Sequence, residues 1–359
     1  MAQDDPLSWI RPEVRRLAPY HVVDPGDAIK LDAMENPYRL PVDLEQPWLE
    51  RLRKVPINRY PDPGAEGVRS RLARALGMRE GNAIVLGNGS DELIQIIALS
   101  VAERGRVVLA PGPSFVMYRM IAAFTGMRFV EVPLQAENYT LDMPAMRTAI
   151  ERFRPAVVFL SYPNNPTGNL WRREEVLEIL ELSPGIVVVD EAYAPFASDT
   201  LVDVAGSRPG LVVMRTLSKM GLAGLRLGLA VGDAPLIGEF DKLRLPYNIN
   251  VLTQASVEFA LDHAPVFERQ AERIRADRGE LFRRLAAMDG VRPYSSEANF
   301  ILFRVIPGIA ASVHACLRER GVLIKNLATL PQLEDCLRVT VGSPEENTVF
   351  LDALGHCLG

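Results

Sequence analysis

The chain of 359 residues is 48% hydrophobic and 24% charged, a composition typical of soluble globular proteins. At roughly 150 residues per domain, this length predicts about two domains. The net charge of -5 argues against nucleic acid or an anionic membrane as the main partner.

The amino-terminal segment MAQDDPLSW is acidic and lacks an apolar stretch, so it does not have the pattern of a signal peptide. No run approaches the roughly 18 apolar residues of a membrane span, and we expect a cytoplasmic protein. Cys316, Cys336 and Cys357 are odd in number and far apart, which predicts free or buried thiols rather than a disulfide framework or a zinc site. The four histidines are scattered as well, so we expect no metal site.

The first thirty residues are rich in proline and predict an irregular arm. Helical patterns follow around residues 47–55 and in the second half of 58–77. Short apolar segments then alternate with helical segments at 91–101, 114–126 and 173–180. We predict strands at 83–87, 107–111, 156–161, 186–190, 211–215 and 227–232.

Short, fully apolar strands that alternate with helices predict an α/β fold with a mainly parallel sheet covered by helices on both faces. From about residue 250 the pattern changes to a long charged helix at 267–288, followed by a mixture of strands and a helix up to 342. This change predicts a second, smaller α+β domain. We expect an arm over 1–30, a large domain over 56–249, and a small domain formed by 31–55 together with 250–359.

Polar residues follow five of the predicted strands, at the carboxyl ends where parallel sheets bind their ligands. Taken singly, each has an ordinary structural explanation: a helix cap, a core aromatic, a turn, a solvated strand end or a surface lysine. In chain order the residues are Ser90 and Asp91 after Gly89, then Tyr118, Asn164 or Asn165, Asp190 with Glu191 and Tyr193, and Lys219 in a loop closed by Arg226.

Taken together, these residues match one ligand. They offer an anion cradle at a glycine turn before a helix, an aromatic plane, an amide, a buried carboxylate and a lysine. Pyridoxal 5′-phosphate (PLP) has a phosphate, a flat ring, a phenolic oxygen, a pyridine nitrogen and an aldehyde. The sequence therefore predicts a PLP enzyme in which Lys219 holds the cofactor covalently.

Seven motifs between about residue 20 and residue 342 carry a family resemblance: LDAMENPY, RYPDPG, GNGSDELI, YPNNPTG, VVVDEAY, TLSKMGLAGLRLG and CLRVTVG. With them the chain resembles the histidinol-phosphate aminotransferases, within the fold-type-I PLP enzymes. The resemblance implies a large domain with a mainly parallel seven-stranded sheet sandwiched by helices, plus a smaller α+β domain. It also implies transamination of L-histidinol phosphate with 2-oxoglutarate, giving imidazole-acetol phosphate and L-glutamate in histidine biosynthesis.

The resemblance further implies roles for individual residues. Catalysis would rest on Lys219, on Asp190 at the pyridinium nitrogen, and on Tyr193. The other cofactor residues would be Asn165 at the phenolic oxygen, Tyr118 stacked on the ring, and Ser90, Asp91, Ser218, Arg226 and Tyr60 at the phosphate. The substrate residues would be Tyr20, Asn36, Lys325 and Arg338. Tyr20 and Tyr60 would reach the neighbouring active site of a homodimer.

One departure from the family pattern concerns the substrate. Lys325 stands where the family often has an arginine for the substrate phosphate, and a lysine lacks the bidentate fork of a guanidinium. Our hypothesis is that Lys325 and Arg338 lie at opposite ends of the site and accommodate two anionic substrates, with the order of the assignments left open.

Two other functions stay open at this stage. The first is another enzyme of the same fold, either an aromatic-amino-acid aminotransferase or a PLP decarboxylase or aminotransferase of a phosphorylated amine. The second is a non-catalytic PLP-binding regulatory module. The acidic charge and the absence of a recognisable DNA-binding extension in the sequence argue against the regulatory module.

Overall fold

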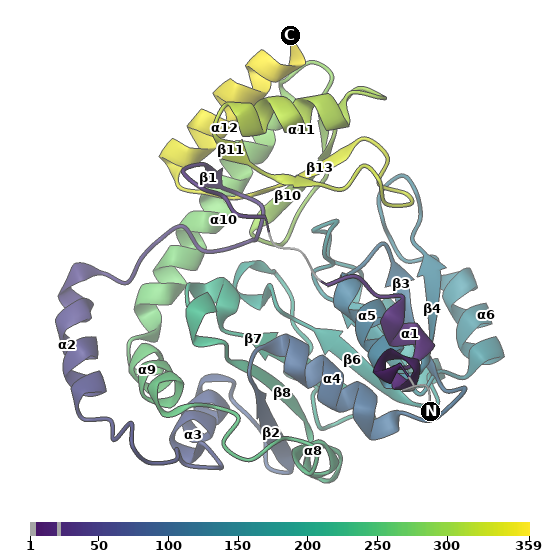
Figure 1. The fold of residues 1–359 in the computed structure, drawn as a ribbon, viewed down its shortest axis with the longest axis vertical. Helices are drawn as coiled ribbons and strands as arrows, with labels where there is room; N and C mark the ends of the chain where they lie inside the picture. The colour runs from purple at the N-terminus through teal and green to yellow at the C-terminus, as the bar shows by residue number, and fades with distance from the viewer. Residues whose placement is uncertain (1–4, 20–22) are drawn as a thin grey trace.

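Three β-sheets organise the protein, as seen in a computed structural model that describes residues 5–19 and 23–359 (Figure 1). The largest sheet has seven strands in the order β2-β8-β7-β6-β5-β3-β4. All its pairings are parallel except those of β8, which runs antiparallel to both neighbours. Its strands are β2 (Asn82–Gly87), β3 (Val107–Gly112), β4 (Arg128–Pro133), β5 (Val157–Ser161), β6 (Ile186–Asp190), β7 (Leu211–Thr216) and β8 (Gly228–Asp233).

Helices cover both faces of this sheet, which confirms the predicted α/β class. Successive residues of a strand point to opposite faces, and in β6 Val187 and Val189 enter one apolar core while Val188 enters another. The first core contains residues of α3 (Glu66–Ala75), α6 (Met143–Phe153) and α7 (Arg173–Leu182). The second contains residues of α4 (Ser90–Val101), α5 (Val116–Thr125) and α8 (Ala234–Asp241).

A third core lies beyond the edge of this sandwich, at the top of Figure 1. It is built on a four-stranded antiparallel sheet and a two-stranded parallel sheet, with orders β12-β13-β10-β9 and β1-β11. The strands are β1 (Ile29–Lys30), β9 (Arg292–Pro293), β10 (Phe300–Arg304), β11 (Val322–Leu323), β12 (Lys325–Asn326) and β13 (Cys336–Thr340). Helices α11 (Ala310–Glu319) and α12 (Pro344–Leu358) pack on these sheets. This α+β layer agrees with the predicted composition of the small domain, whereas the proposed domain bounds stay a prediction.

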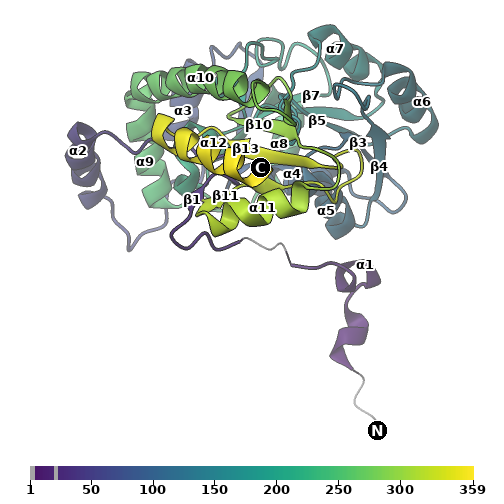
Figure 2. The ribbon, with the colours of Figure 1, turned by 90° about the horizontal axis from the view of Figure 1, so that it is seen from above.

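Helix α10 (Ala264–Ala286) connects the two layers (Figure 1). From its middle onward it buries Ile274, Leu281 and Leu285 in the third core. At its amino-terminal end it follows α9 (Val251–Asp262), which packs against α3 and α2 (Val42–Arg53). Helix α1 (Pro12–Arg15) contacts α5, whereas the preceding η1 (Pro6–Trp9) extends away from the body of the molecule, as Figure 2 shows.

The cysteine prediction was wrong for two of the three residues. Cys316 of α11 and Cys357 of α12 form a disulfide, with their Cα atoms 5.8 Å apart, because the two helices pack side by side. Only Cys336 is a free thiol, and it is buried. Within the described ranges, no helix is both long and apolar enough to cross a membrane.

Candidate functional site

The loops that follow β5, β6 and β7 enclose a cavity of about 120 Å³. The position agrees with the expectation that parallel sheets bind ligands at the carboxyl ends of their strands. Eight of the predicted site residues line this cavity: Ser90, Asp91, Asn165, Asp190, Tyr193, Ser218, Lys219 and Arg226.

Lys219 lies in the short 3₁₀ helix η3 (Ser218–Met220) directly after β7. Its Nζ donates to the backbone oxygen of Ala33 at 3.3 Å and lies 5.7 Å from the centre of the Tyr193 ring. Gly221 ends the turn with a φ of +102°, a conformation that residues with a side chain rarely adopt. Burial, and next the positive charge of Arg338, lower the pKa of Lys219 to about 8. An amine with this pKa is a much better nucleophile and base near neutral pH than an ordinary lysine.

Asp190 is the last residue of β6 and is only 3% exposed. Its Oδ2 accepts a hydrogen bond from the Tyr118 hydroxyl at 2.8 Å, and its Oδ1 accepts one from the backbone N–H of Ala192 at 3.2 Å. Burial raises the pKa of Asp190 to about 7, although both hydrogen bonds oppose this shift. A cation in the cavity would therefore gain a strong partner, since it would relieve the cost of the buried charge.

Asn165 connects two other groups at the cavity. Its Nδ2 donates to the Tyr193 hydroxyl at 3.1 Å, and its Oδ1 accepts a hydrogen bond from Nη1 of Arg338 at 2.6 Å. Arg338 also donates from Nη2 to the backbone oxygen of Asp32 at 2.9 Å. Burial raises the pKa of Tyr193, so its hydroxyl stays protonated and can donate to an oxygen in the cavity.

The start of α4 forms an anion cradle with Arg226. Gly89 precedes the helix with a φ of +87°, and a Cβ added there would lie 2.4 Å from Nη2 of Arg226. A Cβ added to Gly228 would lie 2.7 Å from the backbone nitrogen of Ser90. Arg226 also reaches Ser218, with Nη1 3.4 Å from its hydroxyl. A phosphate group could accept hydrogen bonds here from three kinds of donor: the free N–H groups at the start of α4, the Arg226 guanidinium and the Ser218 hydroxyl.

The aromatic side chain at the cavity differs from the prediction. Tyr118 does not line the cavity: it is 1% exposed, and its ring stacks on Phe159 with ring centres 4.7 Å apart. Phe115, just before α5, lines the cavity instead. The sequence pattern predicted an aromatic residue near the start of this helix, but it could not show which of two aromatics one turn apart faces the site.

The predicted substrate residues that the structure describes do not line this cavity themselves. Asn36 lies outside the cavity lining, where its Nδ2 donates to the Met220 backbone oxygen at 3.2 Å and to Gln270 at 3.0 Å. Lys325 is the direct partner of Arg338 across β12 and β13. The hypothesis that these two cations lie at opposite ends of the site is therefore wrong. Tyr20 lies outside the described residues.

Tyr60 also lies away from the cavity. Its side chain is 81% exposed, and its ring stacks on that of Tyr247 with centres 4.6 Å apart. The role of Tyr60 in a neighbouring chain stays a prediction.

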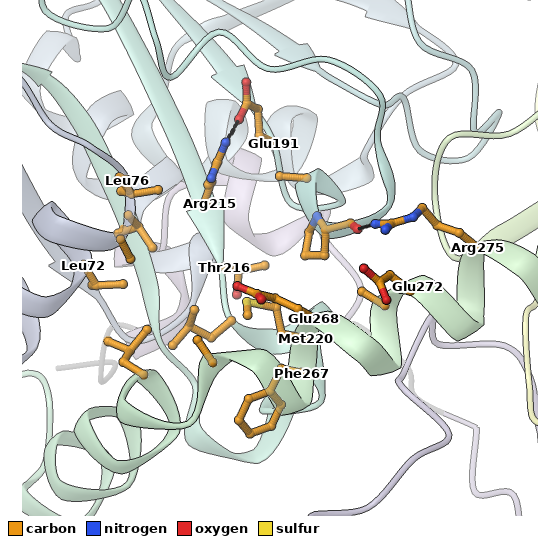
Figure 3. Close-up of a pocket in the computed structure, with 18 residues that line it drawn as sticks. Leu72, Leu76, Glu191, Arg215, Thr216, Met220, Phe267, Glu268, Glu272 and Arg275 are labelled. Carbon is orange, nitrogen blue, oxygen red and sulfur yellow. Dashed lines mark hydrogen bonds and ion pairs between the residues drawn. The ribbon is translucent and has the colours of Figure 1, made fainter.

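A larger cavity of about 390 Å³ lies between α10 and β7, and of the polar residues named at the strand ends only Glu191 lines it (Figure 3). Its walls include Leu72, Leu76 and Phe267, while Glu191 is held by Arg215 at 2.8 Å. Because a site is defined by its chemical groups rather than by its volume, we assign the site to the smaller cavity with Lys219. Among the described residues, no group of three or more His, Cys, Asp or Glu side chains could hold a metal ion.

The fold and the smaller cavity together define a PLP enzyme of the aminotransferase class. At the phosphate cradle, Gly89 and Gly228 leave no room for a side chain. Asp190 is buried, so a cationic partner would stabilise its charged form. The pKa of the Lys219 amine is lowered. These residues fit the phosphate, the ring nitrogen and the aldehyde of the cofactor.

Comparison with known proteins agrees with this class. The family model "Aminotransferase class I and II" matches residues 27–354. A relative from Nitrosococcus oceani, histidinol-phosphate aminotransferase 2, is 53% identical over 99% of this chain and 98% of its own. The histidinol-phosphate aminotransferase of Chromobacterium violaceum is 50% identical over 96% of both chains. The chain therefore belongs to the class I and II aminotransferases and, within them, to the histidinol-phosphate aminotransferase family.

A solved structure shows the same fold. The crystal structure of histidinol-phosphate aminotransferase from Sinorhizobium meliloti, in complex with pyridoxal-5′-phosphate, matches with a TM-score of 0.88. The match covers 98% of both chains at 24% sequence identity. The arrangement of a seven-stranded sheet and a smaller α+β layer is thus that of a known PLP enzyme fold.

Proposed function

We propose that this protein uses PLP to transfer an amino group from L-histidinol phosphate to 2-oxoglutarate, giving imidazole-acetol phosphate and L-glutamate. The observation that carries the proposal is the convergence of Lys219, Asp190 and Asn165 on one cavity, with Arg338 hydrogen-bonded to Asn165 at 2.6 Å. The name shared by the two relatives at about half identity supports the choice of substrate.

Each part of the cofactor has a group to hold it. The phosphate would be held by Arg226, Ser218 and the amino-terminal end of α4 at Ser90 and Asp91. Asp190 would pair with the ring nitrogen. The phenolic oxygen would accept hydrogen bonds from Asn165 and Tyr193, and Phe115 rather than Tyr118 would lie beside the ring. When bound, PLP supplies an electron-withdrawing ring that stabilises negative charge developing on a substrate carbon.

Lys219 has two tasks in this proposal. It would hold the cofactor covalently at rest. Once freed from that bond, its amine would take up and return a proton at the substrate carbon as a general base and acid. With a pKa of about 8, roughly a tenth of such amines are neutral at pH 7, far more than for an ordinary lysine.

The anionic ends of the two substrates would be bound by Arg338 and Lys325. Since these residues are cross-strand neighbours, we propose that they form one anion site used in turn by both substrates. The guanidinium would provide the directional hydrogen bonds, and the ammonium would add charge. Asn36 and Tyr20 would complete the substrate side, with Asn36 acting through the loop that carries Met220.

We also propose a cytoplasmic homodimer in which Tyr60 and Tyr20 reach the neighbouring site. The exposed Tyr60–Tyr247 pair supports this assembly. Mixed dimers of Lys219→Ala and Tyr60→Ala chains test it: each variant alone should be impaired, while the mixture should regain activity because one site per dimer has both residues. No recovery on mixing would contradict a role of Tyr60 across the interface.

The absorption spectrum of the purified protein tests the function directly. A bound PLP should absorb in the visible or near-ultraviolet, and L-histidinol phosphate should convert the spectrum to that of the amine form. With a phosphorylated amino acid that carries an α-carboxylate as the alternative substrate, formation of a keto product without carbon dioxide release would separate transamination from decarboxylation. A protein without a chromophore, or a spectrum unchanged by Lys219→Ala, would contradict the proposal.

A further inference from the structure

Among the described residues, Tyr118 makes the one hydrogen bond to the Asp190 side chain that comes from another element of the fold. The Tyr118 hydroxyl donates to Oδ2 at 2.8 Å, whereas the bond to Oδ1 comes from Ala192 in the same segment. Asp190 lines the cavity and Tyr118 does not, so the hydroxyl approaches the carboxylate from the protein side. This geometry leaves the carboxylate accessible from the cavity.

The Tyr118 ring is fixed by two other aromatic rings. It stacks on Phe159 with ring planes 7° apart, and Phe115 contacts it edge-on at 5.6 Å with the planes at 87°. Phe159 belongs to β5, where it pairs with Val188 of β6, two residues before Asp190. The hydroxyl is therefore positioned by the same two strands that position the carboxylate.

We propose that Tyr118 is a positioning residue for Asp190: its hydroxyl holds the carboxylate in one orientation and favours its ionised form, so that it can pair with the ring nitrogen of PLP. This inference rests on the function proposed above. A phenol that donates to a carboxylate is a charge-assisted hydrogen bond, which is stronger than a bond between neutral groups. Burial and the nearby Asp190 charge raise the pKa of Tyr118 well above its usual value, so the hydroxyl remains a donor at every working pH.

The negative charges near Asp190 disfavour its ionised form, so a hydrogen bond that stabilises the carboxylate is needed. Asp91 from α4 and the adjacent Glu191 both raise its pKa, in addition to burial. Hydrogen bonds from Tyr118 and the Ala192 N–H lower it, and the Asp190 charge in turn raises the pKa of Tyr193. The cations Lys219 and Arg226 line the same cavity. Without the Tyr118 hydroxyl the carboxyl group would lose its largest stabilising contact and would be protonated over a wider pH range.

The variant Tyr118→Phe tests this role, since it keeps the ring and removes only the hydroxyl. Tyr162→Phe is the matched control: Tyr162 is also 1% exposed, and its hydroxyl donates to a carboxylate at the same 2.8 Å, but that carboxylate is Asp199. The experiment measures the affinity of each apoprotein for PLP, the absorption of the bound cofactor against pH, and the unfolding of each apoprotein.

For Tyr118→Phe we expect PLP affinity to fall on the order of 10- to 100-fold, the range for losing one hydrogen bond to a charged group. The loss should be larger at about pH 6 than at about pH 8.5, because protonation of Asp190 weakens its pairing with the ring nitrogen. Tyr162→Phe should destabilise the fold comparably yet keep the wild-type affinity and pH dependence.

An unchanged PLP affinity and pH dependence in Tyr118→Phe would overturn the proposal, and so would an equal change in Tyr162→Phe. If the wild-type protein itself fails to bind PLP, the proposed function is wrong and this inference falls with it. The two failures are therefore distinguishable from the wild-type measurement alone.

Discussion

Lys325 and Arg338 are direct partners across the antiparallel strands β12 and β13. Opposite residues of such a pair place their side chains on the same face of the sheet, with Cβ atoms roughly 5 Å apart. Two like charges at this separation repel each other, and an anion bound between them would relieve the repulsion. Arg338 in turn contacts Asn165 at the cavity that holds Lys219. This relationship connects the small-domain sheet to the proposed chemistry.

Replacement of Lys325 should weaken anion binding without stopping the reaction. We expect Lys325→Ala to raise KM for the phosphorylated substrate on the order of 10-fold or more, since a charge-assisted contact contributes about 1.5–3 kcal/mol. Arg338→Ala should weaken the binding of both substrates, because the Arg338 guanidinium also donates a hydrogen bond to Asn165. Steady-state kinetics with each substrate, varied separately, measure these effects.

Two further variants control this experiment. Lys325→Arg keeps the charge and should retain most of the affinity, and Lys242→Ala removes a lysine that is paired with Glu239 on the surface. If Lys325→Ala leaves KM unchanged for both substrates, its role as an anion anchor is wrong.

Replacement of Lys219 should abolish turnover and covalent attachment together. Because general acid–base catalysis contributes on the order of 10²- to 10⁴-fold, Lys219→Ala should lose at least this factor in kcat. After borohydride treatment, mass spectrometry should find the cofactor on the peptide with Lys219 in the wild-type protein and on no peptide in the variant. Attachment to a different lysine in the wild-type protein would rule out the assignment.

Asp190→Asn should have opposite effects on the apoprotein and on the cofactor complex. In the folded apoprotein the pKa of Asp190 is raised to about 7 from 3.8, so between these pH values the folded state binds more protons than the unfolded state. The unfolding free energy then falls as the pH rises through this window. Because asparagine does not titrate, the Asp190→Asn apoprotein should not show this fall. At about pH 8 the variant apoprotein should be the more stable one, and the difference should vanish near pH 4.

The cofactor complex of Asp190→Asn should instead be weaker. Removing one partner of a buried charge pair costs about 3–5 kcal/mol, which corresponds to a loss of PLP affinity of roughly 100-fold or more. Denaturant unfolding of the apoprotein at two pH values, together with PLP titration, measures both effects. A variant that is less stable than the wild-type apoprotein at about pH 8 would contradict the raised pKa.

The features that depend on local pattern could be predicted from the sequence. Strand β6 was predicted with its observed bounds, Ile186–Asp190, because an unbroken apolar run with a carboxylate at its end has few other interpretations. Strand β4 was not predicted. It lies at the edge of the sheet, and its short sequence RFVEVP mixes charged and apolar residues without a regular alternation, with only Val132 buried.

The features that depend on packing between distant segments could not be predicted. Phe115 and Tyr118 are both aromatic and one turn apart, and Tyr118 is the one that packs inward, where it stacks on Phe159 of β5 and donates to Asp190 of β6. The pairing of Lys325 with Arg338 depends on strand register, which the short β12 does not specify by its own pattern. In both cases the residue types were right, and their relative positions required the tertiary structure.

The disulfide between Cys316 and Cys357 should contribute measurably to stability. It joins residues 41 positions apart and encloses the segment that carries both Lys325 and Arg338. In the chain-entropy model a loop of this length contributes about 4 kcal/mol, and engineered cases often give less. We therefore expect Cys357→Ser, or a reducing agent, to lower the unfolding free energy by about 2–4 kcal/mol, measured by denaturant unfolding.

Counting reactive thiols tests the same disulfide independently. The wild-type protein, denatured without reductant, should show one reactive thiol, that of Cys336. Three reactive thiols, together with equal stability of Cys357→Ser, would mean that the disulfide does not form in solution.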